Sequence, residues 1–116
     1  MTTPVKTALN ADVVGYSRLM ADDFESTKLV MDEYERLVSS HVADNQGLLV
    51  NFVGDNFMAL FDEPTDAISA AISISGEIES RNSGLASIRR VRFRMGLDLG
   101  PVTQSGNQWF GDALNI

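Results

Sequence analysis

The sequence predicts an α+β fold of the ferredoxin-like type, in which an antiparallel sheet carries two helices on one face. Strand-like and helix-like segments follow one another in the order βαββαβ, which is the order of the split βαβ motif. The strand-like segments are apolar on both sides, whereas a sheet with one face in water alternates polar and apolar residues. We therefore expect the second face to be covered as well, most simply by a second subunit, and we expect further C-terminal elements to complete the domain.

The first strand and the first helix occupy the N-terminal part of the chain. Residues 7–16 predict a short strand that runs into a turn at Gly15. In the helix that follows, Asp22 and Glu25 fit a capping box at the start, and Gly47 is a stop signal at the end. Between them, apolar residues recur at helical spacing: Val30, Met31, Tyr34, Leu37, Val38 and Val42.

A hairpin and a second helix come next. Residues 48–61 are two apolar runs around Gly54-Asp55-Asn56, residue types that suit a tight turn between two strands. Pro64 starts the second helix, and residues 81–84 end it. One apolar stripe of this helix contains Ala67, Ala71, Ile74 and Ile78, and it is widened by Ile68 and Ile72.

The last strand-like segment begins with strict alternation of apolar and polar residues. Residues 91–105 predict a strand that is broken near Gly100-Pro101. Residues 106–116 predict a turn, a short extended piece and the first turn of a helix. Length and pattern together indicate a single domain over residues 1–116, or part of one.

The charge of the chain argues against a nucleic-acid partner. The formal net charge is −7 and the isoelectric point is near 4.4, whereas binding to a phosphate backbone requires clustered Lys and Arg. The one basic cluster is small and comprises Arg89, Arg90, Arg92 and Arg94.

The sequence has no cysteine, which excludes disulfides and cysteine-based metal sites or nucleophiles. No apolar run approaches the roughly 20 residues of a membrane-spanning helix, and no signal-peptide pattern is present. We expect a cytoplasmic segment that makes no membrane contact.

Two aspartates point to chemistry at one rim of the predicted sheet. Asp12 ends the first strand and Asp55 lies at the hairpin tip, and these strands are neighbours in the split βαβ order. Converging carboxylates suit Mg²⁺ or Mn²⁺, and the turn "VVGYS" beside Asp12 could offer backbone N–H groups to phosphate oxygens. A Gly-Asp turn alone is most often only a turn, but the combination suggests phosphoryl chemistry on a nucleotide.

Three segments carry a family resemblance over nearly the whole chain. "ADVVGYSRLM", "VGDNFMALF" and "WFGDALNI" resemble, in order and approximate spacing, the signature segments of the class III adenylyl/guanylyl cyclase catalytic domain. The resemblance implies a head-to-tail homodimer that converts ATP or GTP to a cyclic nucleotide. In that reaction the ribose 3′-hydroxyl attacks the α-phosphorus and pyrophosphate leaves.

The same resemblance assigns roles to residues of this chain. It implies two ions, Mg²⁺ or Mn²⁺, held by Asp12, Asp55 and the backbone carbonyl of Val13. One ion lowers the pKa of the attacking hydroxyl, and both stabilise charge on the transferring group. The triphosphate would lie against Gly15, Tyr16 and Ser17, and the catalytic asparagine falls on Asn115.

The base-reading positions depart from the family pattern. Adenylyl cyclases typically place Lys where Asn51 stands and Asp where Gln108 stands, and guanylyl cyclases typically carry an acid at the first position. Amides donate and accept, so they impose no fixed pattern on a purine edge. This predicts relaxed selectivity between ATP and GTP, or inefficient turnover. The alternative is a non-catalytic cyclase-homology domain that dimerises or binds nucleotide and regulates a partner.

The family's catalytic arginine would fall four positions after Asn115, beyond Ile116. The family's later triphosphate-binding lysine would also lie beyond that point. We therefore expect the chain to be the N-terminal portion of a cyclase domain, with little activity as an isolated segment.

Overall fold

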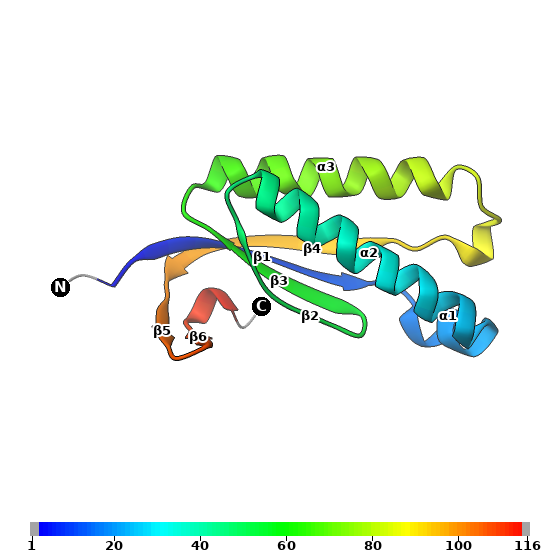
Figure 1. The fold of residues 1–116 in the computed structure, drawn as a ribbon, viewed down its shortest axis with the longest axis horizontal. Helices are drawn as coiled ribbons and strands as arrows, with labels where there is room; N and C mark the ends of the chain where they lie inside the picture. Colours follow the sequence, from blue (N-terminus) through cyan, green and yellow to red (C-terminus); the bar gives the residue numbers. More distant parts are fainter. Residues whose placement is uncertain (1–2, 115–116) are drawn as a thin grey trace.

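The computed structural model describes residues 3–114, and its centre is an antiparallel sheet with helices on one face (Figure 1). The strand order in this four-stranded sheet is β2-β3-β1-β4, and a separate two-stranded sheet is formed by β5 and β6. This arrangement confirms the predicted α+β class with its βαββαβ core. The strands are β1 (Val5–Val13), β2 (Leu48–Val53), β3 (Asn56–Phe61), β4 (Phe93–Pro101), β5 (Thr103–Ser105) and β6 (Gln108–Phe110). The helices are α1 (Tyr16–Asp22), α2 (Phe24–Asp44) and α3 (Pro64–Asn82), with 3₁₀ turns η1 (Ser87–Arg89) and η2 (Asp112–Leu114).

The short helix α1 was not predicted. The sequence pattern indicated one helix starting at Asp22, but Asp22 is the last residue of α1, and α2 begins after Asp23. Asp23 is extended, and its side chain accepts a hydrogen bond from the Ser26 N–H at 3.0 Å. The predicted capping box was therefore wrong by one residue. Helix α1 left no periodic signal because Leu19 is its one buried residue.

Helix α2 ends in a hydrogen-bonded turn that places Gly47 against the core. Gln46 has a φ of +63°, its N–H donates to the Ala43 carbonyl, and the Gly47 N–H donates to the Val42 carbonyl at 2.8 Å. These two bonds form a Schellman motif. The predicted stop at Gly47 lies beyond the actual end, and Gly47 serves another purpose, because a Cβ there would collide with the ring of Phe61.

The apolar stripes of α3 and β4 are narrower than predicted. Ala67, Ala70, Ile74 and Ile78 are buried and Ala71 is half-buried against the core, but Ile68 and Ile72 are 45% and 67% exposed. Each helical residue turns by about 100°, so a stripe widened by Ile68 and Ile72 exceeds the face that the sheet can cover. The side chains of Leu97 and Leu99 are also exposed, although Phe93 and Met95 at alternating positions of the same strand pack against the core.

Strand boundaries also differ in detail. Strand β1 begins at Val5, two residues before the predicted start, and β4 runs through Pro101 before the chain leaves the sheet at Val102. At the outer edge of β4 the Asp98 side chain accepts a hydrogen bond from the Leu99 N–H at 2.9 Å.

The two faces of the main sheet have different covers. We call the side under α2 and α3 the covered face, and its core includes Phe57 and Phe61 from the sheet with Tyr34 and Ile74 from the helices. We call the opposite side the open face. Segments β5, β6 and η2 cover one end of it (Figure 1), in a smaller cluster built from Ala8, Leu60, Val102 and Ala113.

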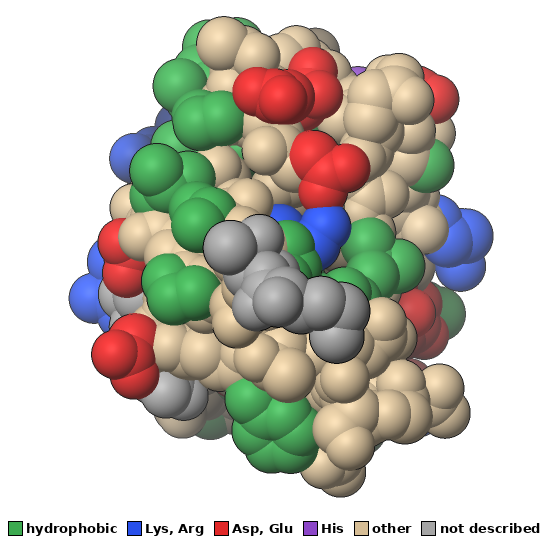
Figure 2. Space-filling model, turned by 90° about the vertical axis from the view of Figure 1, so that its left-hand side faces the viewer, with side chains coloured by type: hydrophobic (Ala, Val, Ile, Leu, Met, Phe, Trp, Pro, Cys, Tyr) green, Lys and Arg blue, Asp and Glu red, His purple; other side chains and the backbone are tan. Residues whose placement is uncertain are grey.

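Part of the expected cover of the second face thus comes from the chain itself. Figure 2 looks onto this end of the molecule, where hydrophobic side chains remain visible beside acidic ones. Leu48 of β2, which pairs with Leu60 of the smaller cluster, is 48% exposed. Within residues 3–114, no helix has the length and apolar character needed to cross a membrane.

Candidate functional site

A hollow of about 540 Å³ occupies the open face beyond the cover of β5, β6 and η2. Antiparallel partners point to the same face of a sheet. Asp12 pairs with Asn56 on β3 and with Arg94 on β4, while Asn51 on β2 pairs with Met58 on β3. The register therefore gathers these side chains from four neighbouring strands. The lining consists of Asn10, Ala11, Asp12, Asn51, Asn56, Phe57, Met58, Arg94, Met95, Gly96 and Leu114.

The Asp12 carboxylate forms a bidentate ion pair with Arg94. The Arg94 Nε and Nη2 atoms donate to the two carboxylate oxygens at 2.9 Å and 3.0 Å. The hydrogen bond to Asp12 raises the pKa of the Arg94 guanidinium above its ordinary value. The side chains are 44% and 73% exposed for Asp12 and Arg94, so solvent screens the pair and its contribution to stability is small.

Arg94 is a site residue that the sequence analysis missed. It was treated as one member of a basic cluster, yet the alternation of β4 contained the necessary signal. Phe93 and Met95 pack against the core of the covered face, so Arg94 between them must point to the open face. Its position opposite Asp12 then follows from the antiparallel pairing of β1 with β4.

The tip of the β2–β3 hairpin lies against the end of β1, as the topology predicted. Gly54 takes a φ of +57°, which suits glycine, and Asp55 follows it in the turn. The Val13 N–H donates to the Asp55 carbonyl at 2.8 Å, which joins the two segments through their backbones. The Asp55 side chain is half-buried at this rim, just outside the residues that line the hollow.

The turn after β1 leads directly into α1. Gly15 takes a φ of +68° and is the N-terminal cap of α1, with no side-chain cap bond. Tyr16 and Ser17 are the first residues of the helix, whose first N–H groups have no partner inside it. Tyr16 is half-buried against the core, and Ser17 is exposed. This turn and the tip of the β2–β3 hairpin lie at the same end of the sheet (Figure 1).

The base-reading positions are not brought together within one chain. Asn51 lines the hollow with Asp12. Gln108 begins β6, among the segments that cover the other end of the open face, and it is not part of the lining. Asn115 lies outside the described residues.

The available donors fit a metal ion that arrives with a nucleotide. Among residues 3–114, no group of three His, Cys, Asp or Glu side chains is placed to hold a metal ion. Mg²⁺ is usually bound through one or two carboxylates together with substrate phosphates, and it keeps several waters. Asp12, Asp55 and the backbone carbonyl of Val13 match that smaller donor set. Arg94 must release the Asp12 carboxylate before a cation can use both of its oxygens.

Comparison with known proteins shows which proteins this chain resembles. No protein-family model matches the chain. Over 109 residues, 93% of its length, the chain is 31% identical to a Rhizobium meliloti (strain 1021) protein described as "Putative adenylate cyclase 3". It spans only 19% of that relative.

Two solved structures extend the comparison. An adenylate/guanylate cyclase/hydrolase from Silicibacter pomeroyi superimposes with a TM-score of 0.88 at 29% identity, covering 98% of this chain and 67% of that one. The guanylate cyclase domain of RhGC from Catenaria anguillulae, in complex with GTP, shares the fold with a TM-score of 0.79 at 17% identity. That match covers 97% of this chain and 69% of the other.

These findings show that the chain is similar to nucleotidyl cyclase domains in sequence and fold. More narrowly, they confirm the resemblance predicted from the three sequence segments. Over nearly its whole length the chain is similar to class III adenylyl/guanylyl cyclase catalytic domains.

Proposed function

We propose that this chain is the N-terminal portion of a catalytic domain that converts ATP or GTP to a 3′,5′-cyclic nucleotide and pyrophosphate. The observation that carries the proposal is the hollow on the open face, whose rim holds Asp12 beside the backbone-linked hairpin tip with Asp55. A hollow lined with asparagine amides, a carboxylate and a guanidinium suits a polar, anionic ligand better than an apolar one. The related cyclases make a nucleotide the first choice.

Asp12, Asp55 and the carbonyl of Val13 would hold two Mg²⁺ or Mn²⁺ ions. The ions would lower the pKa of the ribose 3′-hydroxyl and neutralise charge at the α-phosphate. Asp12 lies near the end of strand β1, and Asp55 lies in a tight turn. Because both are held on well-ordered backbone, their side chains would be well positioned to bind the ligand.

The chain's own residues would bind the remaining parts of the nucleotide. Gly15, Tyr16 and Ser17 would contact the triphosphate through the backbone of the turn before α1. Arg94 would serve the same anion, because its guanidinium fork matches two phosphate oxygens once Asp12 is released. Asn51 and Gln108 would meet the purine, and Asn115 would stabilise the transferring group.

A head-to-tail homodimer would complete the site. The hollow has no cover within residues 3–114, and Gln108 lies outside the lining that contains Asn51. A second copy facing the open face would close the hollow, exclude water and bring its own base-reading residue to the purine. Exclusion of water strengthens the electrostatic contacts on which such a reaction depends.

The test is Asp55→Asn in the protein that contains the complete domain, with Asp44→Asn as the matched control. Asp44 is exposed at the end of α2, away from the hollow. With Mn²⁺ and ATP or GTP, Asp55→Asn should lower cyclic nucleotide production by roughly a thousandfold or more, as loss of a transition-state charge partner does. The melting temperature and the oligomeric state should stay as in the wild type. Retained activity in Asp55→Asn would contradict the proposal.

The amides at Asn51 and Gln108 also favour a second candidate, a non-catalytic regulatory domain. That candidate expects nucleotide binding or dimerisation in the wild type without turnover. For an active domain, the rates on ATP and on GTP show whether selectivity between the two nucleotides is relaxed. Comparable rates support relaxed selectivity, and a preference above about a hundredfold, nearly 3 kcal/mol, excludes it.

A further inference from the structure

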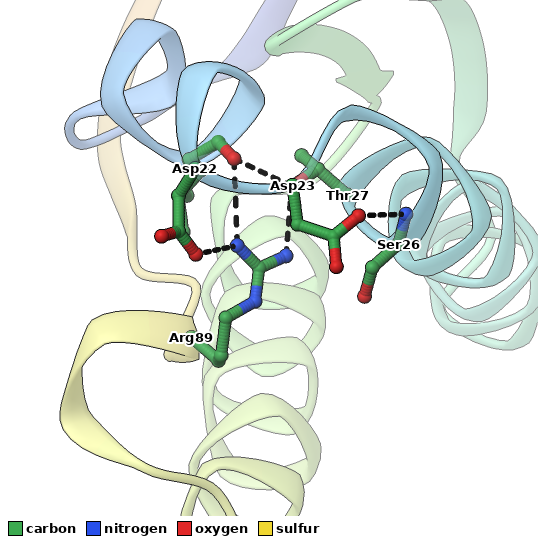
Figure 3. A network of polar contacts seen from close by, with 6 residues as sticks. Asp22, Asp23, Ser26, Thr27 and Arg89 are labelled. Atoms are coloured by element: carbon green, nitrogen blue, oxygen red, sulfur yellow. Dashed lines mark hydrogen bonds and ion pairs between the residues drawn. The ribbon is translucent and has the colours of Figure 1, made fainter.

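One arginine outside the hollow forms hydrogen bonds that connect the η1 turn with helices α1 and α2. Arg89 belongs to η1, the turn between α3 and β4, and its side chain reaches the junction of α1 and α2 (Figure 3). Its Nη1 atom donates to Asp22 Oδ2 at 2.9 Å and to the Leu19 carbonyl at 3.4 Å. Its Nη2 atom donates to the hydroxyl of Thr27 at 2.8 Å.

The Leu19 carbonyl is the centre of this junction. It accepts hydrogen bonds from the Asp23 N–H at 3.1 Å and from the Thr27 hydroxyl at 2.9 Å, in addition to Arg89. Thr27 is buried, with 1% of its surface exposed, so its hydroxyl has to find partners inside the protein. The Thr27 hydroxyl accepts a hydrogen bond from Arg89 and donates one to the Leu19 carbonyl, so both of its roles are satisfied.

Apart from Leu19 and the half-buried Tyr16, helix α1 has few other anchors. It is seven residues long, it buries only Leu19, and no side chain caps its N-terminus. A helix of this length is not stable by itself and depends on tertiary contacts. The Arg89 contacts therefore supply a large part of what fixes its C-terminal end, where a cation also interacts favourably with the free carbonyls.

We propose that Arg89 is a positioning residue for the nucleotide site, acting through α1. The helix starts one residue after Gly15 and spans only about 10 Å. A tilt at the end held by Arg89 therefore shifts the turn at Gly15, Tyr16 and Ser17. This inference rests on the proposed function, in which that turn contacts the triphosphate.

The geometry requires an arginine. Two different Nη atoms serve two helices at once, and the planar guanidinium fixes the angle between these contacts. The single ammonium of a lysine could keep the Asp22 contact or the Thr27 contact in good geometry, but not both. Arg89→Lys should therefore restore only part of what Arg89→Met removes.

The neighbouring Arg90 offers a matched control. It lies directly after η1, and its Nε atom donates to the Leu85 carbonyl at 3.0 Å, within the same loop. Arg90→Met removes the same charge and a hydrogen bond without touching α1 or α2. Differences between the two variants then report the junction and not the general loss of a surface cation.

The first measurement is hydrogen exchange in the absence of nucleotide. Arg89→Met should raise exchange of the backbone amides in residues 16–22 by about tenfold or more, and leave the middle of α2 and the strands unchanged. Arg90→Met should match the wild type. Equal exchange of α1 in Arg89→Met and wild type, or a rise spread over the whole domain, would overturn the inference.

The second measurement separates binding from chemistry in the protein that contains the complete domain. Arg89→Met should raise the KM for the Mn²⁺–nucleotide about tenfold and change kcat much less, with Arg89→Lys between it and the wild type. An active wild type whose Arg89→Met variant keeps its KM would overturn this inference alone. A wild type with neither turnover nor nucleotide-dependent protection of α1 would overturn the proposed function instead.

Discussion

The covered face and the open face are formed by the same strands, but they carry different kinds of side chain. On the covered face, Phe52 stacks on Phe57 with ring centroids 5.7 Å apart, and Phe93 meets both rings edge-on. On the open face, the neighbouring positions carry Asp12 and Asn56, and Arg94 lies beside Phe93 in sequence. Because side chains alternate along a strand, a step of one residue moves from the packed core to the hollow. Stability and chemistry can therefore be altered separately on adjacent residues.

The largest expected effect contrasts Phe57→Ala with Asn56→Ala. Phe57 is 1% exposed within the aromatic cluster, so its truncation should lower the free energy of unfolding by about 3–5 kcal/mol. Asn56 is exposed on the open face, and its truncation should change the free energy by no more than about 0.5 kcal/mol. Urea denaturation of both variants measures this. Similar losses in the two would show that the faces are not energetically distinct.

The next effect tests how tightly the covered face is packed. Gly47→Ala would place a methyl group against the Phe61 ring, and we expect it to destabilise the fold by about 1–3 kcal/mol. Gly76→Ala is the control, because Gly76 lies in α3 with nothing within 4 Å of an added Cβ. Replacing a helical glycine there should stabilise the fold, by up to about 1 kcal/mol. The same sign for both changes, read from thermal unfolding, would argue against close packing at Phe61.

On the open face, Arg94→Gln should change the affinity for Mn²⁺ without changing the stability of the fold. The ion pair with Asp12 is solvent-screened, so the melting temperature should stay close to that of the wild type. Mn²⁺ binding without nucleotide should become several-fold tighter, because Asp12 loses the cation that competes for it. Paramagnetic resonance of free Mn²⁺ measures this, with the exposed Arg92→Gln as the control. Weaker Mn²⁺ binding in Arg94→Gln would count against Asp12 as a metal ligand.

The smallest effect concerns a polar group inside the covered face. Burial raises the pKa of the Tyr34 hydroxyl above its ordinary value of 10.0, because the phenolate would lose its hydration. The folded chain then holds this proton more tightly than the unfolded chain, so stability should fall as the pH rises above about 10. Tyr34→Phe should reduce that fall. Urea midpoints at neutral and alkaline pH test it, and identical slopes in the two proteins would contradict it.

The order of the elements was predictable because each long element buries a regular stripe. Helix α1 was missed because a seven-residue helix with one buried side chain has no such stripe. The exposure of Leu97 and Ile72 was also missed, because alternation and helical spacing show which residues share a face but not how far the cover on that face extends.

The site was predictable where topology alone determines it. The pairing of β1 with β3 brings Asp12 and the Asp55 turn to one rim, and this needed only the strand order. The pairing of Asp12 with Arg94 needed the register of β1 against β4, which the sequence does not state. The roles of the site residues stay predictions.

The hydrogen bond from the Leu99 N–H to the Asp98 side chain has a consequence for self-association. An edge strand with free N–H and C=O groups can template the addition of a strand from another molecule, which is how β-aggregates grow. At this end of β4 the Leu99 N–H already donates to the Asp98 side chain, and Pro101 has no backbone N–H. A carboxylate also stands where an incoming strand would have to pack. The exposed leucines of β4 therefore lie on an edge that resists aggregation at its C-terminal end.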